Sequence, residues 1–283
     1  PINQDWESYN NNGHTIYKTH LDTTAIAEQM GERFKTVYQL FINDRMMIPS
    51  QIINYANPTD PTTGTPDFPE PGTVWDGKPD EFNQTKLLID VDSPEEWSYS
   101  DSTGELFIFT SDGLSPEGNN IRIRVLDRVL TSGALTAYPN GIPYGIDGAE
   151  HVTFRGIEFY AGAVGLYGTH HFTLEDCKFF YSTDNGGFNQ NTPGLIYPSS
   201  MSQFLSGSHA SVIDCVFKFI NDYPLNINDC DSSLVENCLF EYNDWTNGTH
   251  HWLWNGYSMA CTVRYVTIQN SMSPGIFTGI RSL

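Results

Sequence analysis

The stretch "HVTFRGIEFYAGAVGLYGTHHFTLEDCKFF" (residues 151–180) contains the same pattern of apolar residues twice. Its first half superposes on its second half when Ile157 is aligned with Cys177, a shift of 20 residues. Self-similarity of this kind indicates stacked repeats, because each repeat buries its apolar side chains mainly against its neighbours. The stretch therefore predicts a repeat protein.

The repeat continues through five consecutive units. Counted from Ile157, the reference residues of the later units follow at intervals of 20, 38, 23 and 28. The residues three before and two after each reference are apolar, which is strand alternation interrupted by one extra residue. The reference residues are Ile157, Cys177, Cys215, Cys238 and Val266; three residues earlier stand Phe154, Leu174, Val212, Val235 and Val263, and two residues later Phe159, Phe179, Phe217, Phe240 and Ile268.

The extra residue before each reference predicts a sharp bend between two strands. It is Gly156, Asp176, Asp214 and Asn237 in four units, which are the types that best tolerate a left-handed backbone, and Tyr265 in the fifth. A third apolar stretch belongs to each coil, as in "GIDG", "GLYG", "LNIN" and "WLWN". Three strands per repeat describe one coil of a parallel β-helix, in which like residues stack at roughly 4.8 Å.

Five cysteines lie in the second half of the chain, and none forms a Cys-x-x-Cys pair. Zinc-site spacing is therefore absent. Cys177, Cys215 and Cys238 share the reference position, so we interpret this column as buried small thiols and not as a redox or metal site.

The first part of the chain shows no repeat. "VYQLFINDRMMI" alternates around Asn43–Asp44, and "EWSYSDSTGELFIF" around residues 102–104, so both predict β-hairpins. The proline-rich residues 57–73 predict a surface loop, and "ERFKTV" allows at most a short helix. We therefore expect an all-β protein with a β-hairpin-rich region at 1–125 and β-helix coils at 126–283.

The charge of the chain limits its partners. The 34 acidic and 14 basic residues give a formal net charge of −20, which repels nucleic acids and anionic membranes. No apolar run approaches the roughly 20 residues that span a bilayer. The chain begins at Pro1, so we expect a processed or partial product from which a secretion signal has been removed.

The coil pattern "HVTFRGIEF", "HFTLEDCKF", "SVIDCVF" and "SLVENCLF" resembles that of the secreted, right-handed parallel β-helix proteins of the pectin-lyase-like superfamily, over about residues 120–283. The preamble "VYQLFINDRMMIP" resembles that of microbial β-helix proteins predicted to be glycoside hydrolases, although "PSQIINYANP" lacks the Arg and Trp that many of these carry. The resemblance implies an extracellular protein that cleaves or binds polysaccharide. Fold alone does not choose among lyases, hydrolases and non-catalytic binders.

Three outward columns follow from the register. His151, His171 and His209 share one turn position, which fits a metal site or a repeated turn residue. Arg155 and Glu175 occupy the same position on adjacent coils, so we expect them to form an ion pair.

The third column consists of aspartates beyond the second strand of three coils. Asp184, Asp222 and Asp244 lie five, five and four residues after the core phenylalanine of their coil. Neighbouring carboxylates would then be about 5 Å apart, which suits a retaining glycosidase pair or oxygen ligands around Ca²⁺. We predict Asp222 and Asp244 as the catalytic pair, although turn residues with solvated carboxylates would also explain the pattern.

Two insertions interrupt the coils, "NGGFNQNTPGLIYPSSMSQ" and "NDWTNGTHHWLWNGY". The second brings Trp245, Trp252 and Trp254 together with His251. The tryptophans could stack on sugar rings while the histidine moves protons, or the tryptophans could simply cap the interior of the coils. Asp229 is a further candidate for substrate binding. Asn83 and Asn247 fit the N-glycosylation pattern.

These features predict a secreted protein that binds or hydrolyses a neutral glycan. The repeat region has two lysines, Lys178 and Lys218, and Lys178 lies on an outward position without a basic neighbour, which argues against a polyuronate lyase. The alternative is a non-catalytic subunit of an extracellular filament, because "SPGIFTGIRSL" begins a sixth coil without a polar cap.

Overall fold

The computed structural model divides into two compact units, residues 1–126 and 127–283, which are described separately. The described residues are 5–30, 37, 39–50, 88, 91–92, 94–126, 128–137, 143–182, 202–220, 224–243, 253–256, 258–270 and 276–278. The proline-rich stretch 57–73 lies outside them, as does all of "ERFKTV" except its last residue.

The first unit is built mainly on a five-stranded sheet with strand order β1-β2-β7-β6-β5. The predicted hairpin around residues 102–104 is confirmed as β6 and β7, which pair antiparallel. The short helix α1 (Thr23–Met30) was not predicted. The strands of the sheet are β1 (Glu7–Asn11), β2 (His14–His20), β5 (Ile48–Pro49), β6 (Glu96–Tyr99) and β7 (Glu105–Ile108).

A second, three-stranded sheet has the order β4-β3-β8, with β3 (Gln39–Ile42), β4 (Arg45–Met46) and β8 (Ile121–Arg124). The predicted hairpin at Asn43–Asp44 is confirmed, since both turn residues have a positive φ, 49° and 65°. Two consecutive left-handed residues match the twist of the flanking strands, which explains the Asn-Asp pair. The fully buried side chain of Trp97 anchors the core of this unit.

The second unit contains two five-stranded parallel sheets that follow the repeat. The predicted columns are confirmed: Phe154 pairs with Leu174 in the first sheet and Phe159 with Phe179 in the second, and the pairing continues in register through all five coils. The first sheet comprises β12 (Thr153–Arg155), β15 (Thr173–Glu175), β18 (Ser211–Ile213), β21 (Leu234–Glu236) and β24 (Thr262–Arg264); the second comprises β13 (Glu158–Tyr160), β16 (Lys178–Phe180), β19 (Val216–Lys218), β22 (Leu239–Glu241) and β25 (Thr267–Gln269).

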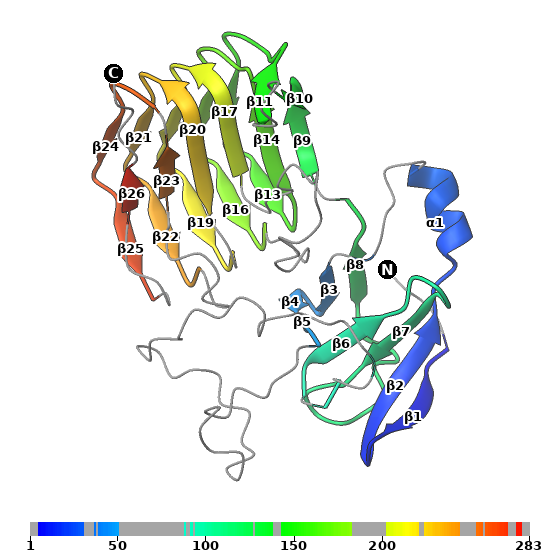
Figure 1. The fold of residues 1–283 in the computed structure, drawn as a ribbon. Helices are drawn as coiled ribbons and strands as arrows, with labels where there is room; N and C mark the ends of the chain where they lie inside the picture. Colours follow the sequence, from blue (N-terminus) through cyan, green and yellow to red (C-terminus); the bar gives the residue numbers. More distant parts are fainter. Residues whose placement is uncertain are drawn as a thin grey trace, which may run out of the picture. The chain divides into compact units, whose positions relative to one another are not determined.

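A third sheet of six strands, all parallel, completes the coils, and Figure 1 shows its strands beside those of the first two sheets. Its order is β26-β23-β20-β17-β14-β9. The parallel stacks are those expected of a β-helix-like fold. The strands are β9 (Arg128–Ser132), β14 (Ala163–Tyr167), β17 (Ser202–Ser208), β20 (Leu225–Asp231), β23 (Leu253–Gly256) and β26 (Ile276–Thr278).

One predicted strand is wrong. The stretch "GIDG" does not belong to the parallel sheet, because β11 (Pro143–Ile146) pairs antiparallel with β10 (Ala134–Ala137). In the parallel sheet, the strand that precedes β14 and pairs with it is β9. A hairpin therefore interrupts the first coil, at a place where residues 138–142 carry turn-forming Pro139, Asn140 and Gly141.

The interior of the coils is a stack of aromatic rings and thiols. Phe179, Phe217 and Phe240 are fully buried and stack at 4.7 and 4.8 Å between ring centroids, with interplanar angles of 5° and 4°. Each such residue contributes about 1.5–3 kcal/mol by its burial. Cys177, Cys215 and Cys238 are buried as predicted.

Candidate functional site

Most of the predicted site residues lie outside the described residues. This holds for the Asp column, for His251, for two of the three tryptophans and for both glycosylation sites: Asp184, Asp222, Asp244, His251, Trp245, Trp252, Asn83 and Asn247. The structure describes Asp229 and the backbone of Trp254. It also describes the strands on both sides of the turns that carry the Asp column.

The residues that lead into these turns are anchored in the interior. Ser182, Ile220 and Asn243 are buried at the equivalent position of three coils. Asn243 joins two coils, because its amide group donates to the Phe217 carbonyl oxygen at 2.9 Å and accepts from the Ile220 amide at 3.0 Å. The Asn that precedes Asp244 therefore has a structural role.

An aromatic ladder stands immediately before the same turns. Tyr181, Phe219 and Tyr242 lie on successive coils, and their rings stack at 5.0 and 5.6 Å with interplanar angles of 14° and 8°. The first two are partly buried, whereas Tyr242 is 46 % exposed. Sequence reasoning missed this ladder, although an aromatic residue recurs four positions after Cys177, Cys215 and Cys238.

All three ladder residues have a positive φ of 54–59°. A left-handed backbone costs a non-glycine residue roughly 1–3 kcal/mol unless the surrounding structure holds it. Here the hydrogen bonds between coils maintain the left-handed backbone. The Tyr181 amide donates to the Lys218 carbonyl, and the Phe219 amide donates to the Glu241 carbonyl of the next coil. The stacking of the coils therefore maintains the backbone of the aromatic ladder.

A charged group flanks the ladder on the second sheet. Glu241 forms an ion pair with Lys218 and accepts a hydrogen bond from Gln269 at 2.6 Å. The bond from Lys218 is the main reason that the pKa of Glu241 is lowered. Glu241 is thus held as a carboxylate by its neighbours and is not available as an acid.

The six-stranded sheet carries a row of polar and aromatic residues. Leu225 and Ile227 point into the core, so Asn226 and Asn228 lie on the opposite face of β20. The pairing register places Gln203 and Trp254 at the positions on either side of Asn226. Within the part of the chain that the structure describes, the amide oxygens of Asn226 and Asn228 are buried and accept no hydrogen bond.

Asp229 lies at the end of this row and has a left-handed backbone, with φ 50°. Its carboxylate accepts a hydrogen bond from the Ser206 hydroxyl at 3.4 Å, and Ser206 has the same left-handed conformation on the preceding coil. Ser206 and Asp229 are not paired between β17 and β20, although the residues on either side of them are. The two residues therefore form a local irregularity in these strands. Asp229 is therefore held as a turn residue, and its role toward substrate stays a prediction.

The predicted histidine column is confirmed as a stack of imidazole rings. His171 lies between His151 and His209, with centroid distances of 4.6 and 4.4 Å. Face-to-face rings direct their nitrogens along parallel lines and not toward one point, whereas a metal needs converging ligands at about 2 Å. The column is thus the repeated turn residue and not a metal site; all three histidines have a positive φ.

The described residues contain no group of three or more His, Cys, Asp or Glu side chains that could hold a metal ion. Nor is any helix among them long and apolar enough to cross a membrane. Comparisons of the chain with protein-family models, curated proteins and solved structures find no match.

Proposed function

We propose that the second unit is a right-handed parallel β-helix of the pectin-lyase-like kind, and that the protein is secreted and hydrolyses a neutral polysaccharide. The in-register stacking of five coils supports the β-helix. Parallel strands joined by crossovers are almost always right-handed. The excess of acidic residues makes a polyanionic glycan a poor ligand and leaves neutral sugars as the better one.

The observation that carries the proposal is the row across the six-stranded sheet. Gln203, Asn226 and Trp254 share one register position on three neighbouring strands. Amide groups can exchange hydrogen bonds with sugar hydroxyls without adding charge, and an indole offers a face for a sugar ring. This combination suits an uncharged glycan better than a uronate, which would call for basic partners.

The turns that carry the Asp column connect the aromatic ladder to this row. Asp222 follows Phe219 by three residues and precedes Asn226 by four. Asp222 lies five residues after the core phenylalanine of its coil and Asp244 four, so they stand one position apart in register on adjacent coils that stack at roughly 4.8 Å. In the proposed site their carboxyl groups reach the separation of about 5–5.5 Å that a retaining glycosidase uses. In the proposed reaction one of Asp222 and Asp244 attacks the anomeric carbon while the other protonates the leaving oxygen as the glycosidic bond breaks. Water, deprotonated by the second carboxylate, then cleaves the glycosyl ester and frees the first, with His251 available for proton transfer.

The tryptophans of the insertion have a binding role in this proposal. Trp245, Trp252 and Trp254 would provide stacking surfaces for successive sugar rings, with Asp229 at the end of the row. The Asp column offers a second chemistry at the same place, because Asp184, Asp222 and Asp244 could together supply oxygen ligands to Ca²⁺.

The test is hydrolysis of a panel of neutral polysaccharides by the single variants Asp222→Asn and Asp244→Asn, measured as release of reducing ends. We expect each variant to lose at least about 100-fold in rate, since positioned acids and bases contribute at least that much. Asp176→Asn is the matched control, because Asp176 is an exposed bend residue whose φ of 50° also suits Asn. Unchanged activity in both site variants would contradict the proposal.

A further inference from the structure

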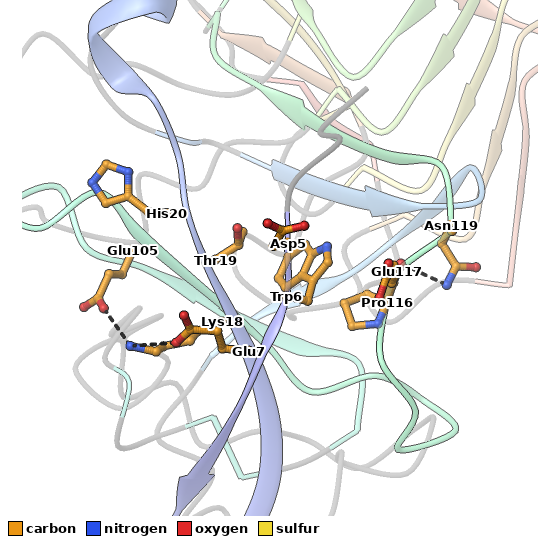
Figure 2. Close-up of a pocket in the computed structure, with 11 residues that line it drawn as sticks. Asp5, Trp6, Glu7, Lys18, Thr19, His20, Glu105, Pro116, Glu117 and Asn119 are labelled. Atoms are coloured by element: carbon orange, nitrogen blue, oxygen red, sulfur yellow. Dashed lines mark hydrogen bonds and ion pairs between the residues drawn. The ribbon is translucent and has the colours of Figure 1, made fainter.

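The first unit contains a cavity of about 780 Å³ that no feature of the repeat explains. It lies where the chain enters β1, and its lining comes from the start of β1, the end of β2, the start of β7 and the turn at residues 116–119. Figure 2 shows the indole of Trp6 between Asp5 and the turn that carries Pro116 and Glu117. The cavity belongs entirely to this unit.

The walls of the cavity are fixed by the fold. Trp6 directly precedes β1, whose pairing with β2 brings Glu7 opposite Lys18, and its ring packs against the core of the unit. The opposite wall is pinned to the turn between β3 and β4, because the Asn43 side chain donates to the Asn119 side chain at 2.7 Å and accepts from the Asn120 amide at 3.1 Å. The site is therefore preorganised on both sides.

The charges of the cavity are unbalanced. Its lining contains four carboxylates, those of Asp5, Glu7, Glu105 and Glu117, against the single ammonium group of Lys18. That ammonium group is already occupied, since Lys18 lies 3.3 Å from Glu105 and 3.8 Å from Glu7. Among the described residues, the remaining two carboxylates form an ion pair with neither Lys18 nor His20, which also line the cavity.

The side chains around Trp6 also have unused bonding capacity. Within the described part of the chain, neither the Trp6 indole nor the carboxylates of Asp5 and Glu117 form a hydrogen bond or an ion pair. An aromatic face beside carboxylates attracts an organic ammonium group, by interaction of the cation with the ring and by charge-assisted hydrogen bonds. The net charge of −20 adds long-range attraction for such a ligand.

We propose that this cavity binds the ammonium group of an amine-bearing ligand, with Trp6 as the ring platform and Asp5 and Glu117 as the counter-charges. The proposal rests on the first unit alone and does not depend on the glycan site proposed for the second. Two sources supply this chemistry, an amino sugar and an aliphatic polyamine. Their shared feature is a protonated amine on an apolar frame.

Isothermal titration calorimetry of the full chain tests the proposal with three probes: a glucosamine hexamer, its N-acetylated neutral counterpart and spermidine. We expect the glucosamine hexamer to bind with an affinity that falls as salt is added. The neutral hexamer reports any binding at the glycan site proposed for the second unit, which salt should affect less. Binding of spermidine as well would show that the ammonium group suffices. Selective binding of the glucosamine hexamer would assign the amino sugar.

The variants locate the site. Asp5→Asn combined with Glu117→Gln should weaken the binding of the glucosamine hexamer at least about 10-fold, and Trp6→Phe should weaken it less, because Phe keeps the packing but offers a poorer ring for a cation. Asp101→Asn is the control, since Asp101 is an exposed carboxylate outside the cavity. Unchanged affinity for the glucosamine hexamer in the double variant, or no binding by any amine, would overturn the proposal.

Discussion

The residue that follows the first strand of each coil has a left-handed backbone, whatever its side chain. Gly156, Asp176, Asp214 and Asn237 adopt φ values of 50–68°, as their types predict. Tyr265 adopts φ 56° as well, although its side chain gives no such preference and is 74 % exposed. Stacking therefore determines the backbone at this position, because the bend must match that of the coil beside it.

Stacking also determines the titration of the histidine column. Partial desolvation of the His171 ring, followed by repulsion from His209 and His151, lowers the pKa of His171. His170 adds to this repulsion, and Glu150 opposes it. In an unfolded chain the pKa of a histidine is about 6.5.

The sign of the resulting pH dependence follows from linkage. The unfolded chain binds more protons than the folded chain between the lowered pKa and about 6.5, so the His171 contribution destabilises the fold as pH falls through about 6.5 and levels off below the lowered pKa. We predict that urea unfolding midpoints, measured between pH 8 and pH 5, fall more steeply in the wild type than in His171→Asn.

Asn is chosen for this variant because it tolerates the φ of 52° at His171. The comparison between the two proteins removes the effect of titrating carboxylates, which both chains share. Identical pH profiles for wild type and variant would show that the ring stack does not perturb the titration.

At the scale of the element, the backbone of β17 closely approaches the residues that follow β14. Gly207 in β17 leaves no room for a side chain, since a Cβ atom there would lie 2.1 Å from the carbonyl oxygen of Thr169. The obstacle is backbone and cannot rotate away. We predict that Gly207→Ala lowers the free energy of unfolding by about 1–3 kcal/mol, the usual cost of overpacking, as measured by chemical denaturation.

A second glycine provides the control. Gly156 has φ 68°, and a Cβ atom built there meets no other atom within 4 Å. Asp and Asn occupy the same position in the three following coils, so Gly156→Asn should change stability by less than about 1 kcal/mol. Only Gly156 of the two has a left-handed backbone, so equal losses in both variants would mean that the contact with Thr169 is not what makes Gly207→Ala costly.

Elements with a repeated or alternating pattern could be predicted from the sequence, and isolated ones could not. The parallel columns and both hairpins follow from apolar spacing and from turn residues such as Asn43 and Asp44. The hairpin of β10 and β11 was missed because "GIDG" has the apolar spacing of a coil strand. Helix α1 was missed because Thr23–Met30 is a short, weakly patterned segment whose first turn contains no acidic residue.

The candidate site was only partly predictable for a physical reason. Columns are visible in the sequence because stacking repeats them, which is why the pairing of Arg155 with Glu175 at 2.6 Å was correctly predicted. The row of Gln203, Asn226 and Trp254 was hidden, because its members differ in type and become neighbours only through the register of β17, β20 and β23. The cavity around Trp6 has no repeat at all and appears only once the strands of the first unit are paired.

At the scale of the whole molecule, the central claim is that the second unit binds a neutral glycan across the turns between its second and third sheets. Hydrogen–deuterium exchange of the full chain with and without neutral oligosaccharides tests it directly. We predict glycan-dependent protection in two segments, residues 219–228 and 242–256, with β12 and β15 unchanged. Protection confined to other segments, or absent with every glycan, would contradict the claim; protection of β24 and β25 that grows with protein concentration instead would favour a filament subunit.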